Sequence, residues 1–336
     1  MSRALDLQVE PSRCTRCGAC SALRPSMFDV SAPVSRVAHQ PSADETLWAD
    51  VARWICPTDA IRARAVDSDA PSIPPPPDDG SLFDALAGGA EAVRWQLADI
   101  PWAELDASRA PPELRAVVRE MAFSENATYS ATQRFLDALG DDVDFSRWVS
   151  VWFYEETRHP YVLMEWLRRV GERLPDDFIL RGRVSTPLMR SIAGTLVTNV
   201  VSEITASQAY RYLARTSPEP VLSHLAKRIA GDEARHAASF FRFARRYLER
   251  LPDGAARERA RGLEVVHAWL GGGQAVTHPV QQMIERLGAA GTGASFDLDF
   301  DAIRTRVVHV VGLLLDVPLR GAQDVAPALR EILARK

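Results

Sequence analysis

The four cysteines of this chain have a spacing that indicates a metal cofactor. Cys14, Cys17 and Cys20 follow one another at intervals of three residues, and Cys56 stands alone before a proline. Three thiolates on one tight loop and one remote thiolate can hold an iron–sulfur cluster, because thiolates are soft anionic ligands. A zinc site, the alternative, usually pairs two Cys-x-x-Cys knuckles, so the spacing favours a cluster. A disulfide framework is not expected, since residues 1–13 contain no continuous apolar stretch of the secretory kind.

A second pattern is a pentad that occurs twice, as EETRH at residues 155–159 and as DEARH at residues 232–236. In each copy a glutamate precedes a histidine by three residues, so on a helix both side chains share one face and can reach one metal ion. A single Glu-x-x-His is weak evidence, because helices rich in charged residues contain it by chance. Two matched copies indicate a metal centre shared by two helices. The ligands predicted from the pentads are Glu156, His159, Glu233 and His236.

A di-iron centre in a helical bundle needs one further glutamate from each of two other helices. Glu203 is the only acid between residues 186 and 219, where a lone carboxylate is costly to bury without a cation. On the helix predicted before the first pentad, Glu125 is in register with Val118 and Met121 on the inner face. The alternatives on that helix, which fit its outer face better, are Glu113 and Glu120. The complete predicted set is Glu125, Glu156, His159, Glu203, Glu233 and His236.

Long amphipathic helices are predicted to position these residues. The first begins at the proline pair of residues 111–112 and ends at about Leu139. Asp144 is predicted to cap the second, and Pro160 is expected to bend it locally. The second, third and fourth helices are predicted over residues 145–170, 187–214 and 219–251. Further helices are predicted near residues 257–270, 276–288, 302–315 and 325–335. Four central helices of this length form a bundle with room for a buried site.

The chain divides into three parts by composition. Residues 1–68 are short and mixed in pattern, with strands predicted at residues 5–9 and 60–65. Residues 69–83 include four consecutive prolines and are predicted to be an extended, semi-rigid linker. Residues 84–336 form the predicted helical domain.

The segment from Val9 to Ile61 resembles a single-cluster bacterial ferredoxin through its three-cysteine loop and its Cys56-Pro57 pair. Members of that family that lack the middle cysteine carry a three-iron cluster, whereas Cys17 is present here. The resemblance therefore implies a [4Fe–4S] cluster that transfers electrons. The cysteines that would hold it are Cys14, Cys17, Cys20 and Cys56.

Residues from about 113 to 250 resemble the ferritin-like superfamily, and most closely its soluble acyl-carrier-protein desaturase branch, whose two acid-Glu-x-Arg-His motifs match the pentads. The resemblance implies a mainly α fold: a ferritin-like four-helix bundle with extra C-terminal helices, preceded by a small α+β ferredoxin domain. It also implies that Glu155 and Asp232 orient the ligating histidines or tie the helices together through Arg158 and Arg235. Ordinary surface ion pairs are the alternative for these four residues.

The match to desaturases departs from their pattern in places. Desaturases carry a threonine three residues after the third-helix glutamate, and this chain has Ala206 there. The related N-oxygenases carry an extra histidine ligand where this chain has Ile229, which argues against amine oxygenation of that type. The resemblance thus implies di-iron chemistry more firmly than desaturation.

The two halves together predict an oxygen-activating oxidoreductase. Oxygen binds productively to diferrous iron, so each turnover needs two external electrons, and a tethered donor has an effective concentration of roughly millimolar. We expect a desaturase or hydroxylase that acts on a C–H bond in an apolar channel, on an organic substrate that a carrier protein could hold. The alternatives are a rubrerythrin-type oxygen or peroxide reductase and a non-catalytic iron store or redox sensor. The metals are expected to be two irons, with a manganese–iron pair open, and the expected partners are molecular oxygen, a ferredoxin reductase and a second copy in a homodimer.

Charge and hydropathy exclude other classes. The net charge of -4 gives no basic field for nucleic acid. The longest apolar runs, near residues 192–201 and 307–317, are too short to cross a bilayer, so we expect a cytoplasmic protein without membrane contact.

Overall fold

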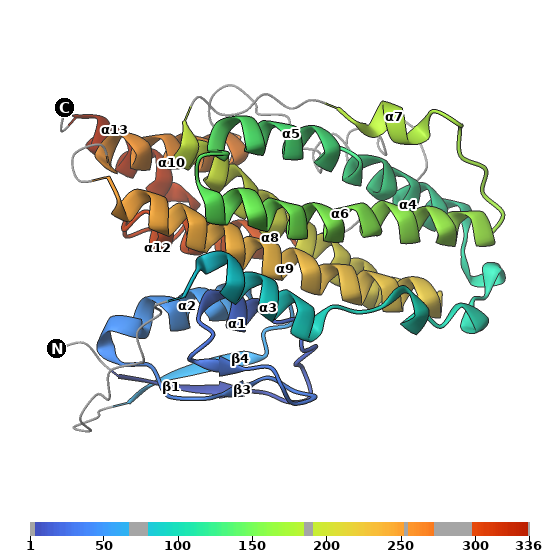
Figure 1. The fold of residues 1–336 in the computed structure, drawn as a ribbon, viewed down its shortest axis with the longest axis horizontal. Coiled ribbons are helices and arrows are strands. Elements are labelled where there is room, and N and C mark those ends of the chain that lie inside the picture. Colours follow the sequence, from blue (N-terminus) through green and yellow to red (C-terminus); the bar gives the residue numbers. More distant parts are fainter. Residues whose placement is uncertain (1–3, 67–79, 185–190, 252–254, 272–297, 335–336) are drawn as a thin grey trace.

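The structure is a computed structural model that describes residues 4–66, 80–184, 191–251, 255–271 and 298–334. It is mainly helical, with a small N-terminal α+β region followed by a helical body, as predicted (Figure 1). Most of the predicted linker, the start of the predicted third helix and the helix predicted near residues 276–288 lie outside the described residues. Within the described residues no helix is long and apolar enough to cross a membrane.

The N-terminal region contains two small antiparallel sheets and two helices. The two predicted strands are confirmed, and they pair with each other: β1 (Ala4–Val9) pairs with β4 (Ile61–Val66), with Val9 opposite Ile61. This pairing brings the chain after Cys56 back beside the cysteine loop. The other elements are β2 (Phe28–Asp29), which pairs with β3 (Arg36–Val37), and the helices α1 (Ala19–Leu23) and α2 (Thr46–Ile55).

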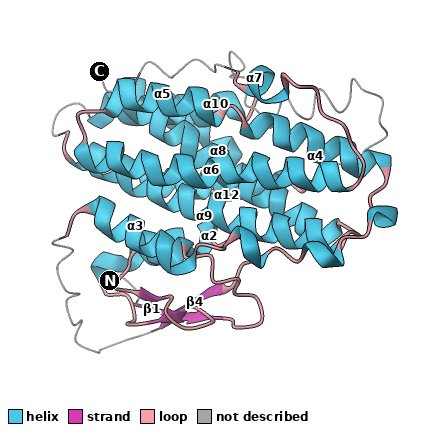
Figure 2. Cartoon of the chain, turned by 45° about the vertical axis from the view of Figure 1, so that its right-hand side comes forward, coloured by secondary structure: helices cyan, strands magenta, loops and turns pink. Residues whose placement is uncertain are grey.

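The bundle consists of long helices packed side by side (Figures 1 and 2). Its members are α4 (Pro112–Glu125), α5 (Thr128–Leu139), α6 (Val143–Arg169), α8 (Ile192–Thr216) and α9 (Pro220–Glu249). The predicted cap of α6 was wrong by two residues: Asp142, not Asp144, accepts the hydrogen bond from Phe145 N. Asp144 instead accepts from Ser81 Oγ and pairs with Arg246, which ties the start of α6 to two other elements.

The first predicted bundle helix is two helices rather than one. α4 ends at Glu125 and α5 begins at Thr128. At the break, the side-chain amide of buried Asn126 donates to the carbonyl of Ala122, which takes the place of the backbone amide in the helical pattern. The backbone amides of residues 126 and 127 bond carbonyls three residues back, which tightens the chain locally.

α9 is buried on all its faces through its middle. Every residue from 229 to 241 is buried, although the segment contains the charged DEARH pentad. The reason is that α9 packs against α6 and α8 on one side and against α1 and α2 of the N-terminal region on the other. In Figure 1 the small sheets lie farthest from the bundle, with α1 and α2 between them and α9.

The remaining helices cover the bundle. α12 packs against α8 and, at the other side, against α2 of the N-terminal region. α10 packs against α8 and α13, and α3 packs against α6 and α1. Their bounds are α3 (Leu82–Val93), α7 (Phe178–Gly182), α10 (Ala255–Trp269), α12 (Phe300–Leu314) and α13 (Val325–Ala334).

Arg306 on α12 holds the segment around Cys56, and its loss is expected to destabilise the fold. It donates to the carbonyls of Trp54 and Cys56 and pairs with Asp59. Arg306→Met should lower the free energy of unfolding by about 1.5–3 kcal/mol, the range for hydrogen bonds that involve a charged group. Urea unfolding of the cofactor-loaded chain measures this change.

Arg304→Met on the same helix is the matched control for Arg306→Met. Arg304 is 50% exposed and, among the described residues, pairs with Asp301, which is 92% exposed, so its loss should change stability by less than about 0.5 kcal/mol. Equal stability losses in the two variants would contradict a special role for Arg306.

Candidate metal centres

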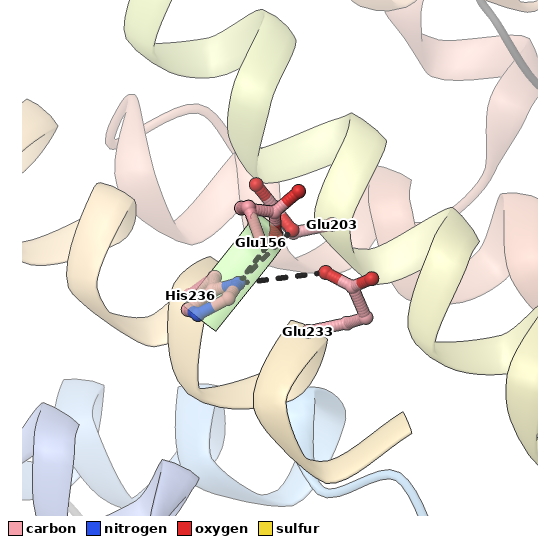
Figure 3. Close-up of side chains that lie close together, drawn as sticks. All are labelled: Glu156, Glu203, Glu233 and His236. Atoms are coloured by element: carbon pink, nitrogen blue, oxygen red, sulfur yellow. Dashed lines mark ion pairs between the residues drawn. The ribbon is translucent and has the colours of Figure 1, made fainter. Parts of the chain in front are cut away.

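Six buried or nearly buried side chains converge between the bundle helices in two groups that share one glutamate. The ligand atoms of each group lie within 4.8 Å of one another. Glu233 belongs to both groups, so its two carboxylate oxygens can face two neighbouring ions. The first group is Glu156, Glu203, Glu233 and His236, drawn in Figure 3, and the second is Glu125, His159 and Glu233. The structure therefore brings together all six residues that the sequence predicts as ligands, although their role as ligands stays a prediction.

The spacing of the pentads explains the geometry. His236 Nδ1 lies 3.5 Å from Glu233 Oε2, one turn earlier on α9, and 2.9 Å from Glu156 Oε1 on α6. His159 Nδ1 lies 3.3 Å from Glu233 Oε1 and 3.8 Å from Glu125 Oε2 on α4. The two imidazole rings are 6.1 Å apart, so each serves one of the two groups.

The acids that open the pentads orient the histidines across the helix pair. His236 Nε2 donates to Glu155 on the opposite helix at 2.9 Å. His159 Nε2 lies 3.3 Å from Asp232, again on the opposite helix. A carboxylate accepts hydrogen bonds only, so Nε2 carries the proton in the neutral form of each ring, and Nδ1 then turns its lone pair toward the centre, where a metal ion could bind.

Unpartnered atoms test whether metal ions fit this centre. Among the described residues, the buried Nδ1 atoms of His159 and His236 and the Oε1 atom of Glu156 have no hydrogen-bond partner. Buried polar atoms are nearly always partnered, and His236 Nδ1 and Glu156 Oε1 approach each other without the geometry of a hydrogen bond. An ion in each group would satisfy all three atoms. The four carboxylates of the two groups would also balance the charge of two divalent irons, so the residues fit a di-iron centre.

In the metal-free site, the closely packed carboxylates shift the pKa values of the candidate ligands. Burial, and next the charge of Glu233, raises the pKa of Glu203 to about 8. Burial and the charge of Glu203 raise the pKa of Glu156. Burial opposes the charged form of His159 and His236, but the surrounding carboxylates outweigh it and raise the pKa of both well above its usual range. When no ion is bound, protons on these glutamates and histidines therefore balance the negative charge that metal ions would otherwise balance.

Iron loading is therefore expected to release protons and to strengthen with rising pH. At pH 7 Glu203 is protonated in the metal-free protein, because its pKa is about 8, and an ion must displace that proton to bind. The Glu203 proton should make the apparent affinity rise about tenfold per pH unit up to about pH 8. The protons of His159 and His236 should add to this dependence and extend it to higher pH, since the pKa of both is raised. An indicator dye in weakly buffered solution measures the protons released per iron pair.

Glu203→Gln provides the comparison for proton release, because it removes the titrating group. It should release about one proton fewer per iron pair at pH 7, the share of a single carboxyl. Asp301→Asn on the exposed face of α12 should release as many protons as the wild type, since its side chain is 92% exposed. Equal release from wild type and Glu203→Gln would contradict the raised pKa.

Side chains outside the predicted set hold the carboxylates in place. Trp152 Nε1 donates to Glu203 at 3.2 Å, Thr128 Oγ1 donates to Glu156 at 2.9 Å, and the Tyr210 hydroxyl donates to Glu125. Tyr210 lies two turns after Glu203 on α8, a spacing that could have identified it. Thr128 carried no such signal, because the helix break before it was not predicted. Trp152 is buried in the core and also donates to a candidate ligand.

The charged residues of the pentads are buried, which excludes ordinary surface pairs. Arg235 pairs at 2.9 Å with both Glu155 and Asp232 and so ties α6 to α9. Arg158 behaves differently: it lies 4.0 Å from the centre of the Trp95 ring and donates to the Trp95 carbonyl. Trp95 Nε1 in turn donates to Asp232 at 2.8 Å, a contact that no sequence motif indicated.

The four cysteines line one cavity in the N-terminal region, and none of the four forms a disulfide bond. Around one zinc ion, sulfurs would be about 3.8 Å apart, since Zn–S bonds are about 2.3 Å long. In the described part of the chain, the groups that fit a single ion are the two Glu/His groups and include no cysteines, which favours a cluster. Backbone amides of Arg16 and Ala60 point at Cys14 Sγ and Cys56 Sγ, at 3.4 and 3.3 Å.

The negative charge of buried thiolates in this cavity must be balanced by a cation. Burial, and next the nearby Cys56, raises the pKa of Cys17 to about 12, and burial and the other cysteines raise the pKa of Cys20 further. Without a cationic partner these thiols would stay protonated at neutral pH. The irons of a cluster supply that charge, so the cavity fits an iron–sulfur cluster.

Two family models match the chain. The model described as the 4Fe-4S single cluster domain of ferredoxin I matches residues 9–63, and the model described as fatty acid desaturase matches residues 116–264. No curated protein matches the chain. The chain therefore carries a single-cluster ferredoxin domain followed by a domain of the fatty acid desaturase family, and its cofactors are a [4Fe–4S] cluster and a di-iron centre.

Proposed function

We propose that this chain uses molecular oxygen to desaturate or hydroxylate a C–H bond of an organic substrate, with its ferredoxin domain as a built-in electron donor. The observation that carries the proposal is the pair of Glu/His groups that share Glu233. The desaturase and ferredoxin matches support an oxidoreductase of the desaturase type with an electron donor. The proposed substrate is an acyl chain, held by a carrier protein.

The chemistry requires the electrons that a ferredoxin supplies. When bound, the di-iron centre provides two adjacent metal ions at which oxygen is reduced. Desaturation removes two hydrogens from a CH2–CH2 unit, and with one O2, two further electrons and two protons it yields an alkene and two waters. Hydroxylation needs the same two electrons and yields an alcohol and one water. The acids Glu155 and Asp232 keep both histidine Nδ1 atoms turned toward the metals throughout.

The external donor is proposed to be an acidic reductase that docks beside the cluster. A cavity of about 440 Å³ lies between the cysteine-loop residues and the ends of α8 and α9. The cations that line it are Arg13, Arg211, Arg215 and Lys227, and no acid lines it. Arg13 and Arg211 also pair with carboxylates of this chain, as do Arg245, Arg246, Arg259 and Arg261 of the arginine-rich segment. This cavity is favoured over that segment because its four cations line one hollow beside the cysteine loop.

Oxygen consumption with product analysis tests the proposed function. The full chain, loaded with both cofactors and reduced chemically, is supplied with acyl chains in free and carrier-bound form. We expect oxygen uptake to increase with substrate, and the product to lack two hydrogens or to carry one added oxygen. Mass spectrometry distinguishes these two products.

Two outcomes would overturn the proposed function. Oxygen uptake that no substrate changes, with water or hydrogen peroxide as the only product, would identify an oxygen or peroxide reductase. A chain that binds both cofactors but never consumes more than one equivalent of oxygen would identify a redox sensor or iron store.

A further inference from the structure

The cysteine loop of the ferredoxin domain touches the metal-binding segment of α9 at one glycine. A Cβ atom placed on Gly231 would lie 2.7 Å from the Cβ of Cys17, closer than real side chains pack. A glycine therefore lets a candidate ligand of the cluster rest directly on α9. Gly231 is immediately followed by Asp232 and Glu233, so the contact lies at the edge of the di-iron site.

One arginine continues from this contact into the bundle. Arg235 Nη1 donates to the Cys17 carbonyl at 2.9 Å. Its Nη2 atom lies 2.9 Å from both Asp232 Oδ1 and Glu155 Oε2. The side chain is only 3% exposed, so this bridge between the two domains is shielded from water.

The two acids that Arg235 contacts are the partners of the two candidate ligand histidines. One chain of polar contacts runs from Cys17 through Arg235 and Glu155 to His236, and a second runs through Asp232 to His159. Each branch ends on a different Glu/His group. A single guanidinium thus links the cluster loop to both halves of the di-iron centre.

We propose that Arg235 provides the route by which electrons pass from the cluster to the di-iron centre, and that Gly231 permits the close approach on which this route depends. The proposal rests on the proposed function, because it assumes that the di-iron centre is reduced during turnover. Each transfer oxidises one reduced cluster and adds one electron to the bundle. Two transfers convert two ferric irons to two ferrous irons, and an external one-electron reductant re-reduces the cluster after each.

A competing route on the other side of the cysteine loop does not have the same continuity. Arg16 Nη2 donates to the Ala92 carbonyl at 3.2 Å, and Trp95, three residues later, donates to Asp232. From this segment Trp95 contacts Asp232 and Arg94 contacts Glu155, but the path to either acid needs the covalent chain between residues 92 and 95. Trp95→Phe removes the hydrogen bond to Asp232 and therefore tests this competing route.

Flash photoreduction tests the route without any substrate or turnover. A photoexcited deazaflavin with a sacrificial donor adds about one electron to the oxidised, cofactor-loaded chain, and freeze-quench EPR follows the decay of the reduced-cluster signal. Gly231→Ala and Arg235→Lys should each slow this decay by about tenfold or more, which corresponds to about 1.4 kcal/mol in the barrier. Lysine keeps the positive charge between the acids but lacks the fork that reaches the Cys17 carbonyl as well.

Matched controls separate the route from general effects of substitution. Gly88→Ala changes a helical glycine on α3 whose Cβ would meet nothing within 4 Å. Arg242→Lys changes another α9 arginine that donates to a carbonyl of the ferredoxin domain, Ala22, and that lies six residues after His236. Both controls should transfer electrons at the wild-type rate.

The outcomes distinguish this proposal from the proposed function. Wild-type decay rates in both Gly231→Ala and Arg235→Lys, with both cofactors present by Mössbauer spectroscopy, would overturn the route alone. Slow decay in Trp95→Phe, with fast decay in Gly231→Ala and Arg235→Lys, would assign electron transfer to the competing path. That result would also overturn the proposed role of Arg235. A wild-type chain with no di-iron centre would overturn both proposals. If Arg235→Lys fails to hold iron, Gly231→Ala still decides, because it replaces no candidate ligand and Mössbauer spectra report whether both cofactors are bound.

Discussion

Glu233→Gln is expected to empty the di-iron site and to abolish turnover. Glu233 is the one residue common to both Glu/His groups, and its two oxygens lie 3.3 and 3.5 Å from the two histidine Nδ1 atoms. The amide keeps the shape but loses the charge that two ions share. Iron should fall from about six to about four per chain, the cluster alone remaining. Substrate turnover should fall by more than about a hundredfold, because even partners that only orient metal ligands cost about 10–100-fold.

Glu249→Gln on the same helix is the control for this loss of charge. Glu249 is 57% exposed and pairs with Arg245 at the end of α9, far along the helix from the pentad. It should retain about six irons and wild-type turnover, since exposed ion pairs contribute little. Metal analysis and Mössbauer spectra measure both variants, and a Glu233→Gln chain that keeps two bundle irons would contradict the shared-ligand geometry.

The convergence of the six candidate ligands could be predicted because it depends on local periodicity. On a helix, a Glu and a His three residues apart must share a face, and a lone acid such as Glu203 in an apolar segment must find a cation. These constraints act within one element, so sequence spacing contains them. The two strands at the ends of the N-terminal region were predictable for a similar reason, from two short segments, whereas their pairing beside the cysteine loop was not predicted.

Features that depend on a competition between backbone and side chain were not predictable in the same way. The helical pattern continues from residue 112 to residue 139, yet the side chain of Asn126 takes a backbone carbonyl and divides the helix. The same competition moved the cap of α6 to Asp142, because Asp144 is held by Ser81 and Arg246 instead. A periodic pattern does not record which acceptor a polar side chain chooses.

Contacts between distant segments were the least predictable. Cys17 and Arg235 are separated by 218 residues, and nothing in either segment indicates the other. Gly231 by itself resembles a weak position in a helix, and only the approach of Cys17 explains it. The burial of the whole DEARH pentad follows from the same docking, since the ferredoxin domain covers the face of α9 that a simple bundle would expose to water.

Removal of the cluster is expected to stop multiple turnover while sparing the di-iron chemistry. Cys14→Ala combined with Cys20→Ala leaves two thiolates, too few to hold a [4Fe–4S] cluster, and iron should fall from about six to about two per chain. With a reductase as donor, turnover should fall by at least about a hundredfold, because the tethered donor contributes an effective concentration of roughly millimolar. Dithionite with a small mediator should still reduce the bundle irons directly and support a single turnover.

The ratio of the two activities separates an electron donor from a structural domain. If the ferredoxin domain only supports the fold, its loss should lower single turnover and multiple turnover alike, because α9 would lose the cover of α1 and α2. If it supplies electrons, single turnover in the double variant should stay within about twofold of the wild type, a change of less than about 0.5 kcal/mol in the barrier. Reductase-driven turnover at the wild-type rate in the double variant would contradict the role of the cluster. The di-iron centre would then receive its electrons directly from the external partner.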